Sequence, residues 1–147
     1  MAFKHILCPV DFSDYSQVAV DALPGLVDRD VGRITLLHVV EVPVSYGGEF
    51  PAEFTRDLDQ QAAKLLDRWA AQLATKVGRV ETKLRVGHPA NQILDALDVD
   101  PSIDLVVIGS HGRSGIKRML LGSVAEKVSR HAPCPVFLAR ATPTRGA

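Results

Sequence analysis

Short apolar runs rich in valine, isoleucine and leucine recur along the chain, at residues 6–10, 34–40, 81–86, 103–108 and 136–139. Several of these runs are too continuously apolar for a strand with one face in water. They are typical of strands in a sheet that is covered on both faces. We therefore predict a strand at each run.

The segments between the runs predict helices. Between the second and third runs, apolar residues repeat with a period near 3.6, at Leu58, Ala62, Leu65, Leu66, Trp69 and Leu73. A third helix is expected to open at Pro89, because proline suits the first helical position, and a fourth to span residues 123–131. Pro24 and Gly25 fall inside the expected first helix, which should kink or end early there.

Strands that alternate with helices are the pattern of a parallel sheet joined by right-handed crossovers. The predicted fold class is therefore α/β, with an open, doubly wound sheet and helices on both faces. In such sheets ligands bind beyond the carboxyl ends of the strands, where the strand order reverses. Polar residues at those ends are the first candidates for chemistry.

Length and composition indicate one ordinary globular domain. The chain has 147 residues, 46% of them hydrophobic and 23% charged. We expect one domain over residues 1–141 and a disordered tail over 142–147. The 17 Lys and Arg residues balance 17 Asp and Glu residues, which argues against a nucleic-acid or anionic-membrane partner. Cys8 and Cys134 form no metal-ligand pattern, and we interpret them as packing residues.

The chain carries no sequence signal for a membrane or a secretory route. No apolar run approaches the roughly 20 residues that cross a bilayer. Pro9 and Asp11 interrupt the first apolar run before a signal core could form. We therefore expect a cytoplasmic protein.

A glycine-punctuated loop follows the fourth predicted strand, from Gly109 to Ser123. Glycines allow close backbone approach, and the first amides of the following helix lack partners, so this arrangement suits a phosphate. The cations of the loop are Arg113, Lys117 and Arg118, without an Asp or Glu. The alternative stays open that the glycines serve turns and that Ser123, with Glu126, forms a capping box.

Asp11 is the second candidate, because it places a carboxylate at the carboxyl end of the first strand. Asp11, Ser13 or Asp14 would each serve as the cap of the next helix, and one cap is enough. Asp11 is then available to accept from a ribose hydroxyl or to hold the water of a metal ion. If the first and fourth strands are neighbours, Asp11 and Gly109 face the same crevice.

The histidines of the chain can be interpreted without a role in the candidate site. We interpret His38 as a core histidine with its hydrogen bonds satisfied, and His88 as the residue that starts the helix at Pro89. For His111 in the loop we favour a solvent-facing side chain over a phosphate contact. Histidine spacing typical of a zinc site does not occur.

Several motifs resemble the universal stress protein family in its ATP-binding branch. They are Gly109-x-x-Gly112 followed after nine residues by Gly122-Ser123, the opening stretch 6–13, Leu37-His38-Val39, Gly87-His88-Pro89 and Pro133-Cys134-Pro135-Val136. The resemblance covers essentially the whole chain.

The resemblance implies a five-stranded parallel sheet in the order 3-2-1-4-5, of the adenine nucleotide alpha-hydrolase type, with ATP across strands one and four. By carry-over, Pro9, Val10 and Asp11 would border the adenosine and Val39 and Ile108 the base. The resemblance implies that ribose and phosphates contact Gly109, Gly112, Gly122, Ser123 and Val124. We add Arg113 to these residues because of its positive charge. The family also implies a homodimer through the last strand, Val136–Ala139, where Pro133 and Pro135 mark an edge strand.

The function expected from these residues is that of an ATP-binding stress-response regulator, with magnesium accompanying the nucleotide. The alternatives are a slow ATPase, a self-phosphorylating protein with Ser123 as acceptor, and an assembly module that ignores nucleotides. No convincing general base is found in the loop. On this interpretation, replacing Gly109 or Gly112 with valine should abolish ATP binding and leave the fold intact.

Overall fold

A computed structural model describes residues 2–41, 52–111 and 121–140. The elements follow the chain in the order β1 (His5–Pro9), α1 (Asp14–Ala22), the 3-10 turn η1 (Leu23–Gly25), β2 (Arg33–Val40), α2 (Ala52–Ala74), β3 (Val80–Val86), α3 (Pro89–Val99), β4 (Leu105–Gly109), α4 (Ser123–His131) and β5 (Val136–Ala139). Strand β4 begins two residues later than its apolar run suggested. The tail over 142–147 lies outside the described residues.

The strands form one five-stranded parallel sheet in the order β3-β2-β1-β4-β5, which confirms the predicted topology. The central strands β1 and β4 are buried along their whole length, whereas the edge strand β3 is half-buried or exposed. The difference follows from position, because only central strands have a neighbour on both sides and helices over both faces.

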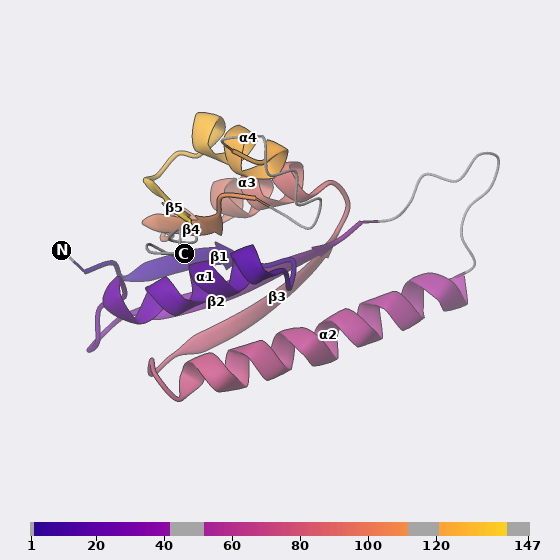
Figure 1. Ribbon diagram of the computed structural model, residues 1–147, viewed down its shortest axis with the longest axis horizontal. Coiled ribbons are helices and arrows are strands. Elements are labelled where there is room, and N and C mark those ends of the chain that lie inside the picture. The colour runs from indigo at the N-terminus through magenta and orange to yellow at the C-terminus, as the bar shows by residue number, and fades with distance from the viewer. Residues whose placement is uncertain (1, 42–51, 112–120, 141–147) are drawn as a thin grey trace, which may run out of the picture.

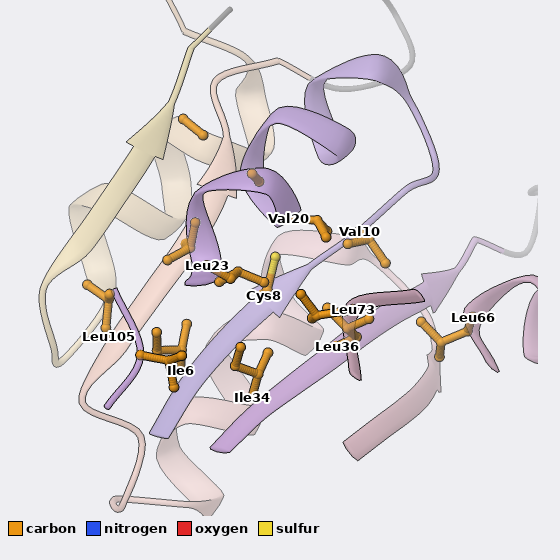
Figure 2. Packing of buried hydrophobic residues seen from close by; sticks show 14 residues of the cluster. Ile6, Cys8, Val10, Val20, Leu23, Ile34, Leu36, Leu66, Leu73 and Leu105 are labelled. Carbon is orange, nitrogen blue, oxygen red and sulfur yellow. The ribbon is translucent and has the colours of Figure 1, made fainter. Parts of the chain in front are cut away.

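Two apolar layers enclose the sheet. Alternate side chains of β1, such as Ile6 and Cys8, pack with residues of α1 and α2, while Leu7 packs with α3 and α4. Figure 1 shows α3 and α4 together on the side of the sheet opposite α2. Figure 2 shows Cys8 between Val20 and Leu23 in the first layer, so the packing role predicted for this cysteine is confirmed.

The first helix ends where its sequence predicts. Helix α1 stops at Ala22, and the chain continues as the 3-10 turn Leu23–Gly25. Pro24 has no amide hydrogen to donate to the preceding turn, so an α-helix through this residue would lose a hydrogen bond.

In the described parts of the chain, none of the helices is long and apolar enough to cross a membrane.

Candidate functional site

The strand order reverses between β1 and β4, which pair in parallel with Ile6 opposite Leu105 and Leu7 opposite Val106. Strand β1 leads into α1 on one face of the sheet, and β4 is followed by α4 on the other. A cavity of about 630 Å³ lies at the carboxyl ends of these strands. This is where doubly wound sheets place their ligands.

Every predicted site residue within the described ranges lines this cavity. These residues are Pro9, Val10, Asp11, Val39, Ile108, Gly109, Gly122, Ser123 and Val124. Gly112 and Arg113, like Lys117 and Arg118, lie outside the described residues. Residues far apart in the sequence are thus brought to one place by the pairing of β1 with β2 and β4.

At the carboxyl ends of the strands, the cavity is lined by residues from both faces of the sheet. Val39 and Ile108 belong to the layer of α3 and α4, and Val39 is half-buried while Ile108 is 6% exposed. Val10 and Phe12 belong to the layer of α1 and α2. A ligand here would therefore meet apolar walls on two sides and the chain ends of β1 and β4 between them.

Asp11 forms the centre of a tight turn and does not cap the helix. Its Oδ1 accepts hydrogen bonds from the Ser13 amide at 3.0 Å, from the Ser13 hydroxyl, and from the Ser16 hydroxyl at 2.6 Å. The N-cap of α1 is Ser13, whose Oγ accepts from the Ser16 amide at 3.3 Å. Of the three candidates for the cap, the structure selects Ser13.

Helix α4 begins one residue earlier than a capping box would require. Its N-cap is Gly122, so Ser123 is the first helical residue. The alternative in which Ser123 caps the helix is therefore wrong. Two hydrogen bonds hold Gly122 in this position: its amide donates to the Ser110 carbonyl at 2.6 Å, and its carbonyl accepts from the Glu126 amide at 2.9 Å. Glycine has no side chain to cap the first turn. The cavity-lining residues Ser123 and Val124 thus belong to a helix end with a partial positive charge, which favours an anion.

Gly109 is needed for packing. A Cβ atom at this position would lie 2.8 Å from the Tyr15 carbonyl oxygen and 2.9 Å from its carbon. The first turn of α1 therefore rests directly on the end of β4. The structure contradicts the expectation that Gly109→Val would leave the fold intact, because a side chain here would push α1 away from the sheet.

Two histidines lie at the cavity, and the prediction for their side chains is confirmed for one and wrong for the other. His38 is 9% exposed and its Nδ1 donates to the Val10 carbonyl at 2.7 Å, which confirms the prediction of a satisfied core histidine. His111 lines the cavity, although a solvent-facing side chain was expected. Its Nδ1 lies 3.1 Å from the Ser110 hydroxyl, and its ring lies 5.2 Å from that of Tyr15.

Sequence reasoning missed an aromatic cluster beside Asp11. The ring of Phe12 lies 4.5 Å from that of His38 and 5.4 Å from that of Trp69, the latter edge to face. Phe12 has φ +65°, a left-handed conformation that is costly for a bulky residue. No sequence signal points to this, because phenylalanine is not a residue that favours such a turn.

Sequence reasoning also missed the wall formed by α2 and α3. The residues of these helices at the cavity are Leu58, Gln61, Ala62, Leu65, Pro89 and Ile93. The helical period had marked Leu58, Ala62 and Leu65 as apolar face positions. The helical period does not show where in the fold this face lies, because the period alone does not say which strand end a helix covers.

The described ionisable groups at the cavity are Asp11, Glu41 and the two histidines. Among the described residues, no group of His, Cys, Asp and Glu is arranged to hold a metal ion. Burial raises the pKa of the Cys8 thiol to about 12, so this thiol stays protonated and inert. To a ligand, the described residues of the cavity offer hydrogen-bonding groups, apolar side chains and the start of α4.

Comparison with known proteins gives a consistent result. The profile of the Universal stress protein family matches residues 2–140. Universal stress protein YxiE of Bacillus subtilis is 33% identical over 148 residues, covering 94% of this chain and 99% of that protein. Among solved structures, universal stress protein UspA of Lactobacillus plantarum has a TM-score of 0.83 at 30% identity, covering 95% of this chain and 99% of that one. Hypothetical protein MJ0577 has a TM-score of 0.85 at 26% identity, covering 98% and 100%. The chain belongs to the universal stress protein family.

Proposed function

We propose that this protein binds ATP, accompanied by magnesium, and acts as a nucleotide-dependent regulator in the cytoplasm. The observation that carries the proposal is the cavity at the carboxyl ends of β1 and β4, where Asp11 and the start of α4 meet. Its volume of about 630 Å³ falls in the range of roughly 300–1,000 Å³ of small-molecule sites.

Each part of ATP has a chemical counterpart in the cavity. The half-buried and buried apolar side chains of Val39 and Ile108 suit a planar base. The Asp11 carboxylate suits the hydroxyls of a ribose, because it accepts hydrogen bonds and charge strengthens them. The first turn of α4, at Ser123 and Val124, suits the phosphates. Magnesium would arrive with the phosphates, which supply the oxygen ligands it prefers.

A solved universal stress protein in complex with cAMP shares this fold, with a TM-score of 0.73 at 22% identity over 97% of this chain. At that identity the likeness concerns the fold. It supports the proposal to the extent that a sheet of this architecture accommodates an adenine nucleotide.

The proposed regulator is a homodimer formed through β5. This strand is an edge of the sheet, and Phe137 within it is 41% exposed. An edge strand presents unpaired backbone groups, so a second copy is a suitable partner. Measuring the mass in solution with and without ATP tests both the dimer and its response to nucleotide.

The first experiment identifies the ligand directly. The protein is purified without added nucleotide and denatured, and the released small molecules are identified by chromatography and mass spectrometry. Stoichiometric ATP supports the proposal and argues against turnover, whereas ADP or AMP shifts the proposal toward hydrolysis. If nothing is released and calorimetry with ATP and magnesium shows no binding, the proposal fails and a nucleotide-independent assembly role replaces it.

A charge placed at the start of α4 tests the phosphate position. Ser123 is exposed at the first helical position, so Ser123→Glu introduces a negative charge where the phosphates are proposed to lie. We expect ATP affinity to fall at least tenfold. Gln72→Glu, an exposed residue of α2 away from the cavity, makes the same charge change and should leave affinity within twofold. Equal affinity of the two variants would refute the phosphate position.

A further inference from the structure

The turn that carries Asp11 is joined to α1 through one buried hydroxyl. Ser16 is 5% exposed, and its Oγ donates to the Asp11 Oδ1 at 2.6 Å while it accepts from the Asp11 amide at 2.8 Å. A serine hydroxyl has one proton to donate and lone pairs to accept, and here both are directed at a single residue. The Ser16 hydroxyl therefore binds both the main chain and the side chain of Asp11.

The position of Ser16 is set by the contact between α1 and β4. The Tyr15 main chain packs on Gly109, where a Cβ atom would approach within 2.8 Å of the Tyr15 oxygen. Ser16 follows directly in the first turn of α1, whose N-cap is Ser13. The hydroxyl thus belongs to a helical turn whose main chain packs against the end of β4.

The chain next to Asp11 is under conformational strain. Phe12 has φ +65°, a left-handed conformation that is unfavourable for a non-glycine residue. The hydrogen bonds of Ser16 to Asp11 lie across this strained residue and oppose its relaxation. Without them, the main chain of Asp11 and the plane of its carboxylate would lose their common anchor.

We propose that Ser16 is a positioning residue that orients the Asp11 carboxylate for the hydroxyls of a nucleotide ribose. This inference rests on the proposed ATP-binding function and deepens it, because it names the residue that makes the site selective for a ribose with its hydroxyls. Ser13 also donates to the Asp11 Oδ1, but it is only half-buried and lies at the N-cap, where the turn meets α1. Ser16 is the buried helical residue that binds both the main chain and the side chain of Asp11.

The geometry explains why orientation matters here. A charge-assisted hydrogen bond between a carboxylate and a hydroxyl contributes most to affinity when the oxygen is already oriented toward the hydroxyl before the ligand binds. The Asp11 Oδ1 accepts from Ser13 and Ser16, and these bonds set the direction of the whole carboxylate. Removing the Ser16 hydroxyl therefore weakens recognition of the ribose and leaves the contacts to base and phosphates in place.

The test compares two ligands on matched variants. Calorimetry measures the binding of ATP and of 2′,3′-dideoxy-ATP, both with magnesium, to wild type, Ser16→Ala and Ser16→Cys. Cysteine fills the volume of serine with a poor hydrogen-bonding group, so it controls for a cavity left by alanine. Ser129→Ala is the matched control, because the Ser129 hydroxyl bonds only within α4, to the Ala125 carbonyl at 2.7 Å. Thermal melts confirm that each variant is folded at the binding temperature.

We expect wild type and Ser129→Ala to prefer ATP over the dideoxy analogue by about tenfold or more. Both Ser16 variants should lose most of that preference through weaker ATP binding, with the affinity for the analogue within twofold of wild type. Asp11→Asn should lose the preference too, and adding Ser16→Ala to it should change little further.

Other outcomes separate the two proposals. If wild type binds neither ligand, the ATP site itself is refuted and Ser16 loses its role with it. If wild type prefers ATP but the folded Ser16 variants keep the full preference, the positioning role alone is overturned. An equal loss of affinity for both ligands also overturns it, since that result indicates a purely structural role for Ser16.

Discussion

The two ends of the central strands use polar residues in opposite ways. At the amino end of β1, the His5 ring lies between two hydroxyls, with Nδ1 2.9 Å from Ser102 Oγ and Nε2 2.8 Å from Thr35 Oγ1. His5 is 4% exposed. At the carboxyl end, Asp11 and the start of α4 surround a cavity of about 630 Å³. One end is filled by contacts within the chain, and the other is left open.

The comparison extends to the carboxylates. At the amino end, Asp104 accepts from the Lys4 amide at 2.9 Å and from the His5 amide at 3.0 Å, so both of its oxygens bind the main chain of the neighbouring strand. At the carboxyl end, the Asp11 Oδ1 accepts from Ser13 in its own turn and from Ser16 in α1, and Asp11 lines the cavity. We infer that the amino end stabilises the sheet, whereas the carboxyl end is the site proposed for the nucleotide. Variants at each end can separate these roles.

The largest effect is expected for Gly109→Ala. A methyl group here would lie 2.8 Å from the Tyr15 carbonyl oxygen, and main chain cannot rotate away as a side chain can. We expect the free energy of unfolding to fall by about 2–3 kcal/mol, measured by chemical denaturation. Gly78→Ala is the control, because it has open space and no positive φ, and should stay within about 1 kcal/mol of wild type. Equal stability of the two variants would contradict the packing role of Gly109.

Asp104→Ala should follow, with a loss of about 2 kcal/mol in unfolding free energy. The change removes a charged acceptor from two main-chain amides at the start of β1. ATP affinity should stay within twofold of wild type, because the cavity lies at the other end of the strands. Asp104→Asn keeps one oxygen acceptor and should lose about half as much stability. A large loss of ATP affinity in a folded Asp104→Ala protein would show that the two ends are not independent.

His5 should make stability depend on pH. Burial first, and then the Arg33 charge, lower the pKa of His5 below 6.5, although Asp100, Glu81 and Asp104 oppose the shift. As pH falls below about 6.5, the unfolded chain takes up the proton before the folded protein does. The unfolding free energy therefore decreases, by at most about 1.4 kcal/mol per pH unit, until the folded pKa is passed.

Denaturation curves between pH 7.5 and pH 5 measure this dependence. The variant His5→Gln should show a shallower fall of stability over that range than wild type. Identical slopes for wild type and His5→Gln would show that His5 is not the group responsible.

The smallest effect on stability is expected for Ser123→Glu, and its sign is opposite. A negative side chain in the first turn of α4 interacts favourably with the helix dipole, so stability should rise by about 0.3–1 kcal/mol. The same variant is expected to bind ATP at least tenfold more weakly. Reduced stability together with reduced affinity would mean that the substitution disturbs α4, and the separation between folding and binding at this end would then fail.

Much of the fold could be predicted from local pattern. Continuous apolar runs indicated buried strands because a strand covered on both faces has no polar side to alternate with. Pro89 and Pro24 marked a helix start and a helix end through the geometry of proline itself. The end of a strand and the start of a helix are local features, and for this reason Asp11 and the residues around Gly122 could be selected as site candidates.

Other features depend on contacts between distant segments. The sequence pattern Ser123-x-x-Glu126 left a capping box open as an alternative, yet the N-cap is Gly122, whose amide donates to the Ser110 carbonyl. The role of Gly109 follows from Tyr15, which lies almost a hundred positions away and packs on it. The approach of α2 to the cavity is a third case, since a helical period defines a face but not its neighbour.

By itself, the sequence determined the strands, the helices and the class of the sheet, because hydrophobic period and proline geometry act over a few residues. It also placed a carboxylate and a glycine at the ends of two strands. Only the tertiary structure decided that these ends meet at one cavity, that Phe12 is held in a strained conformation, and that Ser16 anchors Asp11. The reason is physical: hydrogen bonds and close packing between distant segments exist only once the sheet has brought those segments together.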